Sequence, residues 1–182
     1  LERWSVTLKA AIHAIHLYDA NHPVSTAHGA LPDSVLLEHL SEIDLWGLNV
    51  YRWDQSFTAL NDFVQRSEKG MYFSELGADS FMPVSQLGYA EGGTEKAQAD
   101  ATRSLIEPIL SNDSVAAGLI VFSFTDGWWK AGNPDIQDVG GWAPGSSGVP
   151  YDGTANEEYW GLVDVNRSEK EAYWVVKSLF TE

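Results

Sequence analysis

Glu75 is the side chain in this sequence that is best placed to do chemistry. It follows the apolar run Met71–Phe73, with Gly70 before that run and Gly77 shortly after it. Such a run is typical of a strand buried on both faces of a parallel sheet. Because an unpaired carboxylate is costly to bury, Glu75 either reaches solvent at the sheet edge or has a function there. The functional alternative fits the carboxyl-terminal mouth of a βα barrel, where active sites are built.

Aromatic side chains are the second feature that points to a ligand. The chain has 8 Trp, 7 Tyr and 7 Phe in 182 residues, which is more than its core needs. Flat rings beside carboxylates and amides suit sugars, whose C–H faces stack while their hydroxyls form hydrogen bonds. The alternative is a satellite core, and we expect Trp160 to pack in one and Trp128 or Trp129 to contact a ligand. The long Gly-, Pro- and Asp-rich loop 125–166 holds these rings: Trp128, Trp129, Trp142, Tyr151, Tyr159 and Trp160.

The composition excludes several classes of partner. A net charge of −15 argues against nucleic acids and anionic membranes, and it leaves neutral substrates open. No cysteine is present, so disulfides and thiol chemistry are excluded, and no apolar run has the length of a membrane span. His13 and His16 share an expected helix, but no acidic or cysteine partner has metal-ligand spacing. We therefore expect neither a metal nor a cofactor.

Apolar spacing predicts strands that alternate with helices along the whole chain. The order implies a parallel sheet with right-handed crossovers, and no Gly-x-Gly-x-x-Gly or phosphate loop supports a nucleotide-binding sheet. A complete βα barrel needs eight strands and about 250 residues, so the expected fold is α/β, as half a barrel. The expected strands are Pro23–His28, Ile43–Tyr51, the strand of Glu75 and Gly118–Phe124. The expected helices are Arg3–Ala20, Ser34–Leu40, a helix that contains Phe57, Leu60 and Val64, Thr94–Leu110 and Lys170–Phe180. The third of these helices should bury Phe57, Leu60 and Val64, and the fourth Leu105, Ile106, Ile109 and Leu110.

Four segments resemble the carboxyl-terminal half of the catalytic barrel in clan A retaining glycoside hydrolases, especially the family 2 kin of β-glucuronidase and β-galactosidase. Asp19–Thr26 is similar to a helix end and the fifth strand, and Asp44–Tyr51 is similar to the sixth, D-x-x-G-x-N-x-Y. Phe73–Asp79 resembles the seventh strand, T-E-x-G-A-D, and Gly118–Asp126 the eighth, G-x-x-x-W-N-F-x-D. The resemblance implies that residues 1–182 are strands five to eight of a TIM (β/α)8 barrel.

The resemblance also implies residue roles. Glu75 would be the nucleophile of a retaining double displacement that hydrolyses or transfers O-glycosidic bonds in β-linked saccharides. Tyr51 would hydrogen-bond to Glu75, and Phe122 replaces a tryptophan sugar platform, a role that Trp128 or Trp129 would take. Lys130 ends a W-W-K segment similar to that of barrel proteins acting on β-glucans. The implied substrate-binding residues are Asn49, Tyr51, Asp79, Phe122, Trp128 and Trp129.

The second carboxyl group of such an enzyme is expected outside this chain. A retaining glycosidase needs two carboxyl groups roughly 5 Å apart, and the Asn-Glu pair that supplies the acid/base in the resembled family would lie before Leu1. We therefore expect the isolated chain to be inactive. Of the other carboxylates (Asp79, Glu91, Asp126, Glu157 and Glu158), we expect Asp126 to cap a helix or to fix a loop, and Glu157 and Glu158 to be solvated.

Two other functions stay open on the sequence. The chain could be a carbohydrate-binding or scaffold module without chemistry, or a half-barrel that pairs with itself to cover its exposed strand edges. As part of a larger polypeptide, it would instead pair with a missing amino-terminal half. The expected partner is an oligo- or polysaccharide, and the resemblance implies a periplasmic or extracellular location.

Overall fold

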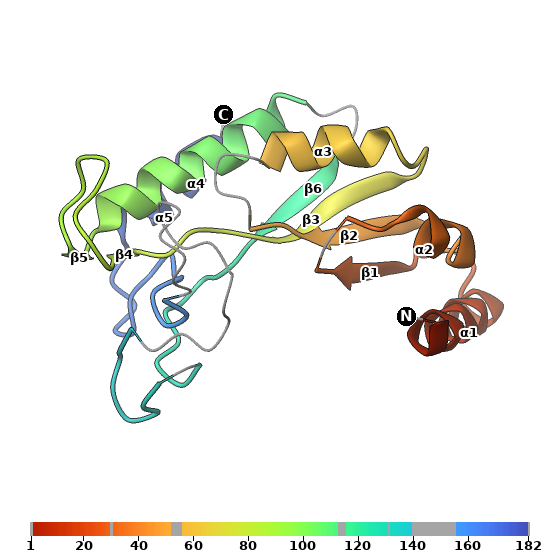
Figure 1. Cartoon of the computed structure of the whole chain (residues 1–182), viewed down its shortest axis with the longest axis horizontal. Coiled ribbons are helices and arrows are strands. Elements are labelled where there is room, and N and C mark those ends of the chain that lie inside the picture. Colours follow the sequence, from red (N-terminus) through yellow and green to blue (C-terminus); the bar gives the residue numbers. More distant parts are fainter. Residues whose placement is uncertain are drawn as a thin grey trace. The chain divides into compact units, whose positions relative to one another are not determined.

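The computed structural model describes residues 2–29, 31–51, 56–112, 116–130, 132–139 and 156–181. These residues form two compact units, which we call the first unit (Leu1–Val50, Thr58–Glu75 and Asn112–Ile120) and the second unit (Tyr51–Phe57, Leu76–Ser111 and Val121–Glu182). The elements, labelled in Figure 1, are α1 (Glu2–Tyr18), β1 (Ser25–His28), α2 (Ser34–His39), β2 (Leu45–Asn49), α3 (Ser56–Val64), β3 (Gly70–Leu76), β4 (Phe81–Met82), β5 (Gly92–Gly93), α4 (Glu95–Leu110), β6 (Ala116–Val121) and α5 (Glu171–Thr181).

A four-stranded sheet with the order β1-β2-β3-β6 forms the centre of the first unit. β1 pairs in parallel with β2, and β2 pairs in parallel with β3. The alternation of strands and helices that the sequence predicts is therefore confirmed, and β1 and β6 are the two edges of the sheet. Whether these edges recruit another chain stays a prediction.

The core of the first unit is built from the apolar runs that predict its strands. Trp46 and Leu48 of β2 and Phe73 of β3 have no exposed surface. α3 covers this core with Leu60 and Phe63, whereas Val64 is 37% exposed. The expectation that Val64 faces inward is therefore wrong, because Phe63, one position earlier, is the buried residue. Phe57 is outside the side chains that the structure describes.

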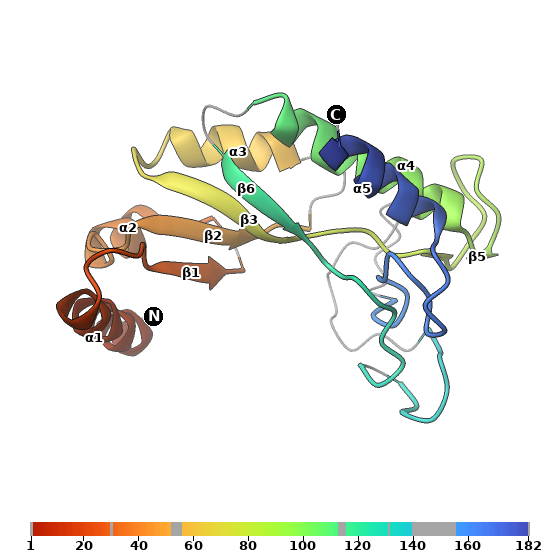
Figure 2. The same cartoon turned by 180° about the vertical axis from the view of Figure 1, so that it is seen from behind.

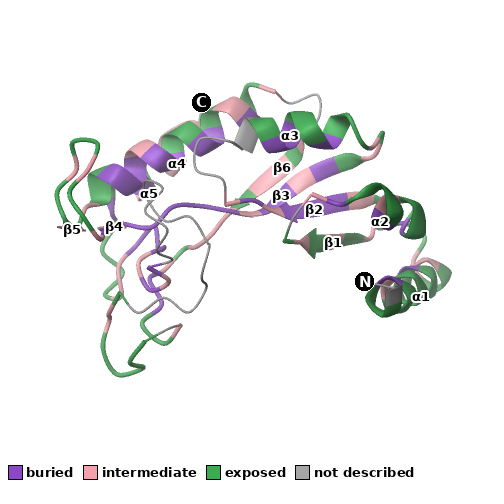
Figure 3. Cartoon of the chain, viewed as in Figure 1, coloured by how far each residue is buried: buried purple, intermediate pink, exposed green. Residues whose placement is uncertain are grey.

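α1 is more exposed than the central strands β2 and β3, as the burial colours of Figure 3 show. Ile12 is buried, but Trp4 and Ile15 are 42% and 46% exposed. The apolar face expected of this helix is thus covered at Ile12 and largely open elsewhere. The ring of Trp4 stacks on His28 at 5.6 Å between centroids.

α4 and α5 pack side by side in the second unit, which Figure 2 shows from behind. Leu105 and Ile106 are fully buried on α4, but Leu110 is 44% exposed because it is the last residue of the helix. Its expected inward orientation is therefore wrong. Pro108 lies within the helix, which continues to Leu110. The short antiparallel pair β4–β5 was not predicted from the sequence.

The loop between β6 and α5 returns along the segment that directly follows β6. Leu162 N donates to the carbonyl oxygen of Ser123 and Val163 N donates to that of Phe124, both at 2.9 Å. Gly161 is needed at this crossing, because a Cβ atom there would lie 2.0 Å from the backbone nitrogen of Asp126. Trp142 and Tyr151 of this loop are outside the described residues.

None of the helices in the described part of the chain combines the length and apolarity needed to cross a bilayer.

Candidate active site

Glu75 is the next-to-last residue of β3, at the carboxyl end of a central strand in the first unit. It is half-buried, and its register partner on β2 is Asn49. The backbone N–H of Val50 donates to the carbonyl oxygen of Glu75 at 2.8 Å. Glu75 of β3 and Asn49 of β2 therefore both lie at the carboxyl end of the sheet.

A register shift lies immediately before this pair. Leu48 is opposite Phe73, but the next residue, Asn49, is opposite Glu75, so that Ser74 is the extra residue on β3. Such irregularities redirect side chains and are common next to active sites. The hydroxyl of Ser74 donates to Oδ1 of Asn49 at 2.6 Å. This bond orients the Asn49 amide, with its NH₂ group as the end turned away from Ser74.

Tyr51 lies in the second unit, within a cluster of three rings. Its ring meets those of Phe122 and Trp160 edge-on, at centroid distances of 6.2 Å and 5.1 Å. Trp160 is 3% exposed, which confirms the expectation that it packs in a satellite core. The expected hydrogen bond between Tyr51 and Glu75 stays a prediction.

Phe122 is covered on one face by a cation. The ammonium group of Lys130 lies 3.9 Å from the ring centroid, and it also forms an ion pair with Glu157 at 2.7 Å. A sugar could stack on this face only after Lys130 moves away. Trp128 and Trp129 are 40% and 63% exposed and meet edge-on at 5.0 Å. These two rings fit the expected aromatic platform better than Phe122 does, and their contact with sugar stays a prediction.

Asp79 is fully buried in a turn of the second unit. Its carboxylate accepts hydrogen bonds from the backbone N–H of Phe81 at 2.9 Å and from the amide of Asn156 at 3.2 Å. The same amide donates to the carbonyl oxygen of Phe81 at 3.1 Å. These bonds tie two distant segments together, which favours a role in holding the loop over the expected contact with substrate.

Asp126 and Lys170 form a buried ion pair of 2.7 Å, with side chains that are 3% and 5% exposed. Asp126 also accepts hydrogen bonds from Gly161 N at 2.7 Å and from the amide of Gln137 at 3.1 Å. Of the two roles expected for Asp126, the fixing of a loop is therefore the one confirmed. Lys170 further donates to Oγ of Ser80 at 3.0 Å.

Glu158 corrects a sequence-based expectation. It was expected to be solvated, yet it is fully buried, and its Oε2 accepts a hydrogen bond from Asp138 N at 2.6 Å. The reason is that the chain around residue 158 packs against the stretch 137–138. Glu157 is engaged with Lys130 rather than solvated, and Glu91 is exposed. Burial, assisted by the charges of Glu158 and Asp126, raises the pKa of Tyr159, so its hydroxyl stays a neutral donor.

Two residues that position others within their own unit were not identified from the sequence. Ser74 orients Asn49, while Gln98 donates from its amide to the carbonyl oxygens of Ala78 and Gly161, both at 3.0 Å. Gln98 is a polar residue on the inward face of α4, a signal that could have marked it. Among the described residues, no group of histidine and acidic side chains is arranged to hold a metal ion.

No protein-family profile matches this chain, and no curated protein sequence matches it. Solved structures do. The β-D-glucuronidase of Dictyoglomus thermophilum is 14% identical, with a TM-score of 0.67 over 96% of this chain and 28% of that one. The family 2 β-galacturonidase of Eisenbergiella tayi, bound to galacturonate, is 18% identical, with a TM-score of 0.70 over 100% of this chain and 31% of that one.

A family 17 enzyme is also similar. The β-1,3-glucanosyltransferase of Rhizomucor miehei is 16% identical, with a TM-score of 0.58 over 91% of this chain and 56% of that one. The chain thus spans 28% and 31% of the glucuronidase and galacturonidase chains. At such low identities, what the matches establish is the fold. The chain has a glycoside hydrolase-like α/β fold.

Proposed function

We propose that this chain is the nucleophile-bearing part of a retaining glycoside hydrolase or transglycosidase that acts on β-linked saccharides, built as strands five to eight of a TIM barrel. The observation that carries the proposal is the pairing of Glu75 with Asn49 at the carboxyl ends of β3 and β2. The carboxyl ends of barrel strands are where such enzymes place their reacting groups. The glycoside hydrolase-like fold supports the same assignment.

The proposed reaction begins with attack of the Glu75 carboxylate on the anomeric carbon, which expels the leaving-group oxygen and forms a glycosyl ester. Water or a second sugar then attacks the same carbon and releases Glu75. Asn49, oriented by Ser74, offers an NH₂ donor at the same carboxyl end of the sheet. A donor fixed before the reaction can stabilise charge that develops in the transition state without reorganising.

The proposal assigns the general acid/base to a residue outside the 182-residue sequence. Asp79, Asp126 and Glu158 are each buried and bonded within the second unit. Such carboxylates hold loops together and are poor candidates for exchanging a proton with a leaving group. The loss of a general acid/base costs about 10²–10⁴ in rate, so the chain by itself should turn over ordinary glycosides very slowly.

A second candidate function is carbohydrate binding without chemistry. The exposed rings of Trp128 and Trp129 favour it, because accessible indoles are typical of sugar-binding surfaces. The two functions differ in whether a bond to Glu75 ever forms.

An activated aryl 2-fluoroglycoside distinguishes catalysis from binding alone. Its leaving group needs no acid assistance, and its glycosyl ester breaks down slowly. The released phenolate is followed after the chain is mixed with the substrate. We expect a burst of about one equivalent per chain, as for other accumulating covalent intermediates. Glu75→Gln should abolish the burst.

The matched control is Glu68→Gln, which removes an exposed carboxylate just before β3, at the other end of the strand. This variant should retain the full burst. A burst that persists in Glu75→Gln would exclude Glu75 as nucleophile. The absence of any burst in the unaltered chain would favour the binding module.

A further inference from the structure

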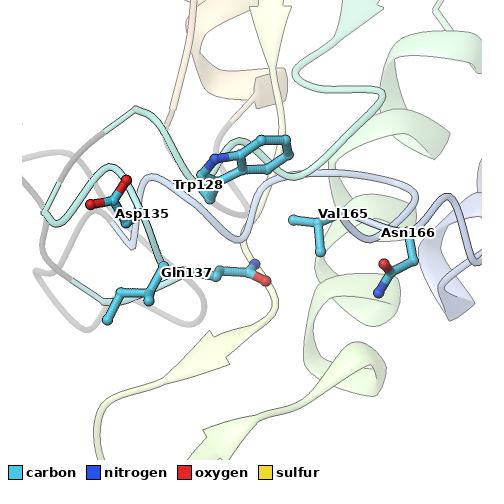
Figure 4. A pocket seen from close by; sticks show the side chains of 6 residues that line it. Trp128, Asp135, Gln137, Val165 and Asn166 are labelled. Atoms are coloured by element: carbon cyan, nitrogen blue, oxygen red, sulfur yellow. The ribbon is translucent and has the colours of Figure 1, made fainter.

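A pocket of about 320 Å³ opens in the second unit, and neither Glu75 nor Asn49 is among its lining residues. Two stretches form it, the loop that follows β6 and the segment that leads to α5. Figure 4 shows its side chains gathered around one space, with the indole of Trp128 on one side and Val165 and Asn166 on another. The lining residues are Trp128, Asp135, Ile136, Gln137, Val165 and Asn166.

The apolar part of the lining is an indole held in place by a second indole. Trp128 is 40% exposed, and the ring of Trp129 stands at 85° to it with 5.0 Å between centroids. This contact limits the rotamers open to Trp128, so stacking of a ligand on its accessible face costs little further side-chain entropy. Ile136, which is 56% exposed, adds a second apolar surface.

The polar part of the lining offers acceptors. The NH₂ group of Gln137 donates to Oδ2 of Asp126 and to the carbonyl oxygen of Glu158, both at 3.1 Å. Both hydrogens of this amide are therefore used, which leaves its Oε1 as an acceptor in a fixed position. Figure 4 shows the amide end of Gln137 directed toward Val165. Asp126 is itself bound by Lys170, so the amide is anchored to the buried ion pair.

The charges around the pocket select against acidic ligands. Among the described residues that line it, Asp135 is the charged one and no lysine or arginine takes part. The chain as a whole carries a net charge of −15. A carboxylate on the ligand would meet a carboxylate in the wall, without a cation to balance it. A ligand with hydroxyl donors and an apolar C–H face avoids this repulsion.

We propose that this pocket binds one neutral pyranose unit of the saccharide, by stacking on Trp128 and by hydroxyl donation to Gln137, Asp135 and Asn166. The inference rests on the proposed function for the class of ligand. It adds a binding site whose lining does not include Glu75, and a preference for neutral over uronic sugars. The preference distinguishes this chain from the galacturonidase whose structure it resembles, which was solved with galacturonate.

Titration of the 182-residue chain with laminaritriose, and with trigalacturonate as the acidic counterpart, tests the inference. Binding is followed by calorimetry and by NMR of the indole N–H groups. We expect laminaritriose to bind, to shift the Trp128 indole signal, and to bind more tightly than trigalacturonate. Trp128→Ala should weaken laminaritriose binding about tenfold, the equivalent of one lost stacking contact.

Two control variants distinguish sugar binding in this pocket from the reaction at Glu75. Trp174→Ala removes an indole that is 53% exposed on α5, outside the pocket, and should leave binding unchanged. Glu75→Gln should abolish the phenolate burst and leave laminaritriose binding intact. Binding that survives Trp128→Ala, fails in Glu75→Gln or favours trigalacturonate would overturn the inference. A chain that shows the burst but binds no laminaritriose would also overturn it, while the proposed function would stand.

Discussion

Removal of the Lys170 ammonium group should destabilise the second unit more than any surface charge change. In the native structure Lys170 Nζ donates to Asp126 Oδ1 at 2.7 Å, to Ser80 Oγ at 3.0 Å and to the Tyr159 carbonyl oxygen at 3.4 Å. Lys170→Met keeps much of the side-chain volume but leaves the Asp126 carboxylate buried without its cation. Breaking a buried ion pair from one side costs about 3–5 kcal/mol.

The lower end of that range applies here. Asp126 keeps two donors, Gly161 N at 2.7 Å and the amide of Gln137 at 3.1 Å. We therefore expect the free energy of unfolding to fall by about 3 kcal/mol. For a chain of this length that corresponds to a melting temperature lower by roughly 6–12 °C. Urea unfolding followed by tryptophan fluorescence measures the first quantity, and calorimetry the second.

The matched control is Lys96→Met, which breaks an ion pair of 2.8 Å on α4 whose partners are 66% and 45% exposed. Solvent screens this pair, so the change should have a much smaller effect. The double variant Lys170→Met with Asp126→Leu removes both buried charges and should recover part of the lost stability. A Lys170→Met chain as stable as Lys96→Met would refute the view that this ion pair fixes the loop.

Two further predictions concern the backbone and the pH dependence. Gly161→Ala should lower the free energy of unfolding by about 3 kcal/mol, as expected for severe overpacking, because a Cβ atom would lie 2.0 Å from Asp126 N and 2.3 Å from the carbonyl oxygen of Val163; an unchanged urea midpoint would contradict this. The Val24 N–H and then His16 lower the pKa of Asp44. Its stabilising effect should therefore be complete above about pH 4, the ordinary value, and be lost as the pH falls through the lower folded-state pKa. Melting curves of Asp44→Asn should show a smaller loss of stability in acid than the unaltered chain, and parallel curves would show that Asp44 is not responsible.

The parts of the fold that could be predicted from the sequence are those determined by residues close together in the chain. Apolar runs mark β2 and β3, and Asp33, which accepts a hydrogen bond from Leu36 N at 2.8 Å, marks the start of α2. Glu75 stands out because a carboxylate ends an apolar strand, and its position in the sheet follows from that pattern. Which helix residues are buried is harder to predict to within one position, as Val64 and Leu110 show.

The remaining features depend on contacts between segments far apart in the chain. Glu158 is buried because the stretch 137–138 packs against it, and the residues next to Glu158 in the sequence do not indicate that contact. Lys170 looks like an ordinary lysine before a helix, yet it pairs with Asp126, 44 residues away. Asn156 binds Asp79 across 77 residues. Pairings of this kind follow from the folded topology, which local spacing does not encode.

The proposed function requires that Glu75 form a covalent bond to the sugar. The most direct measurement is tandem mass spectrometry of the chain after it reacts with the activated 2-fluoroglycoside and is digested at low pH, which preserves the ester. We expect one fluoroglycosyl group, on the Glu75 side chain in the peptide that contains β3. A group attached to any other carboxylate, Asp79 or Asp126 included, would contradict the assignment of Glu75 as nucleophile.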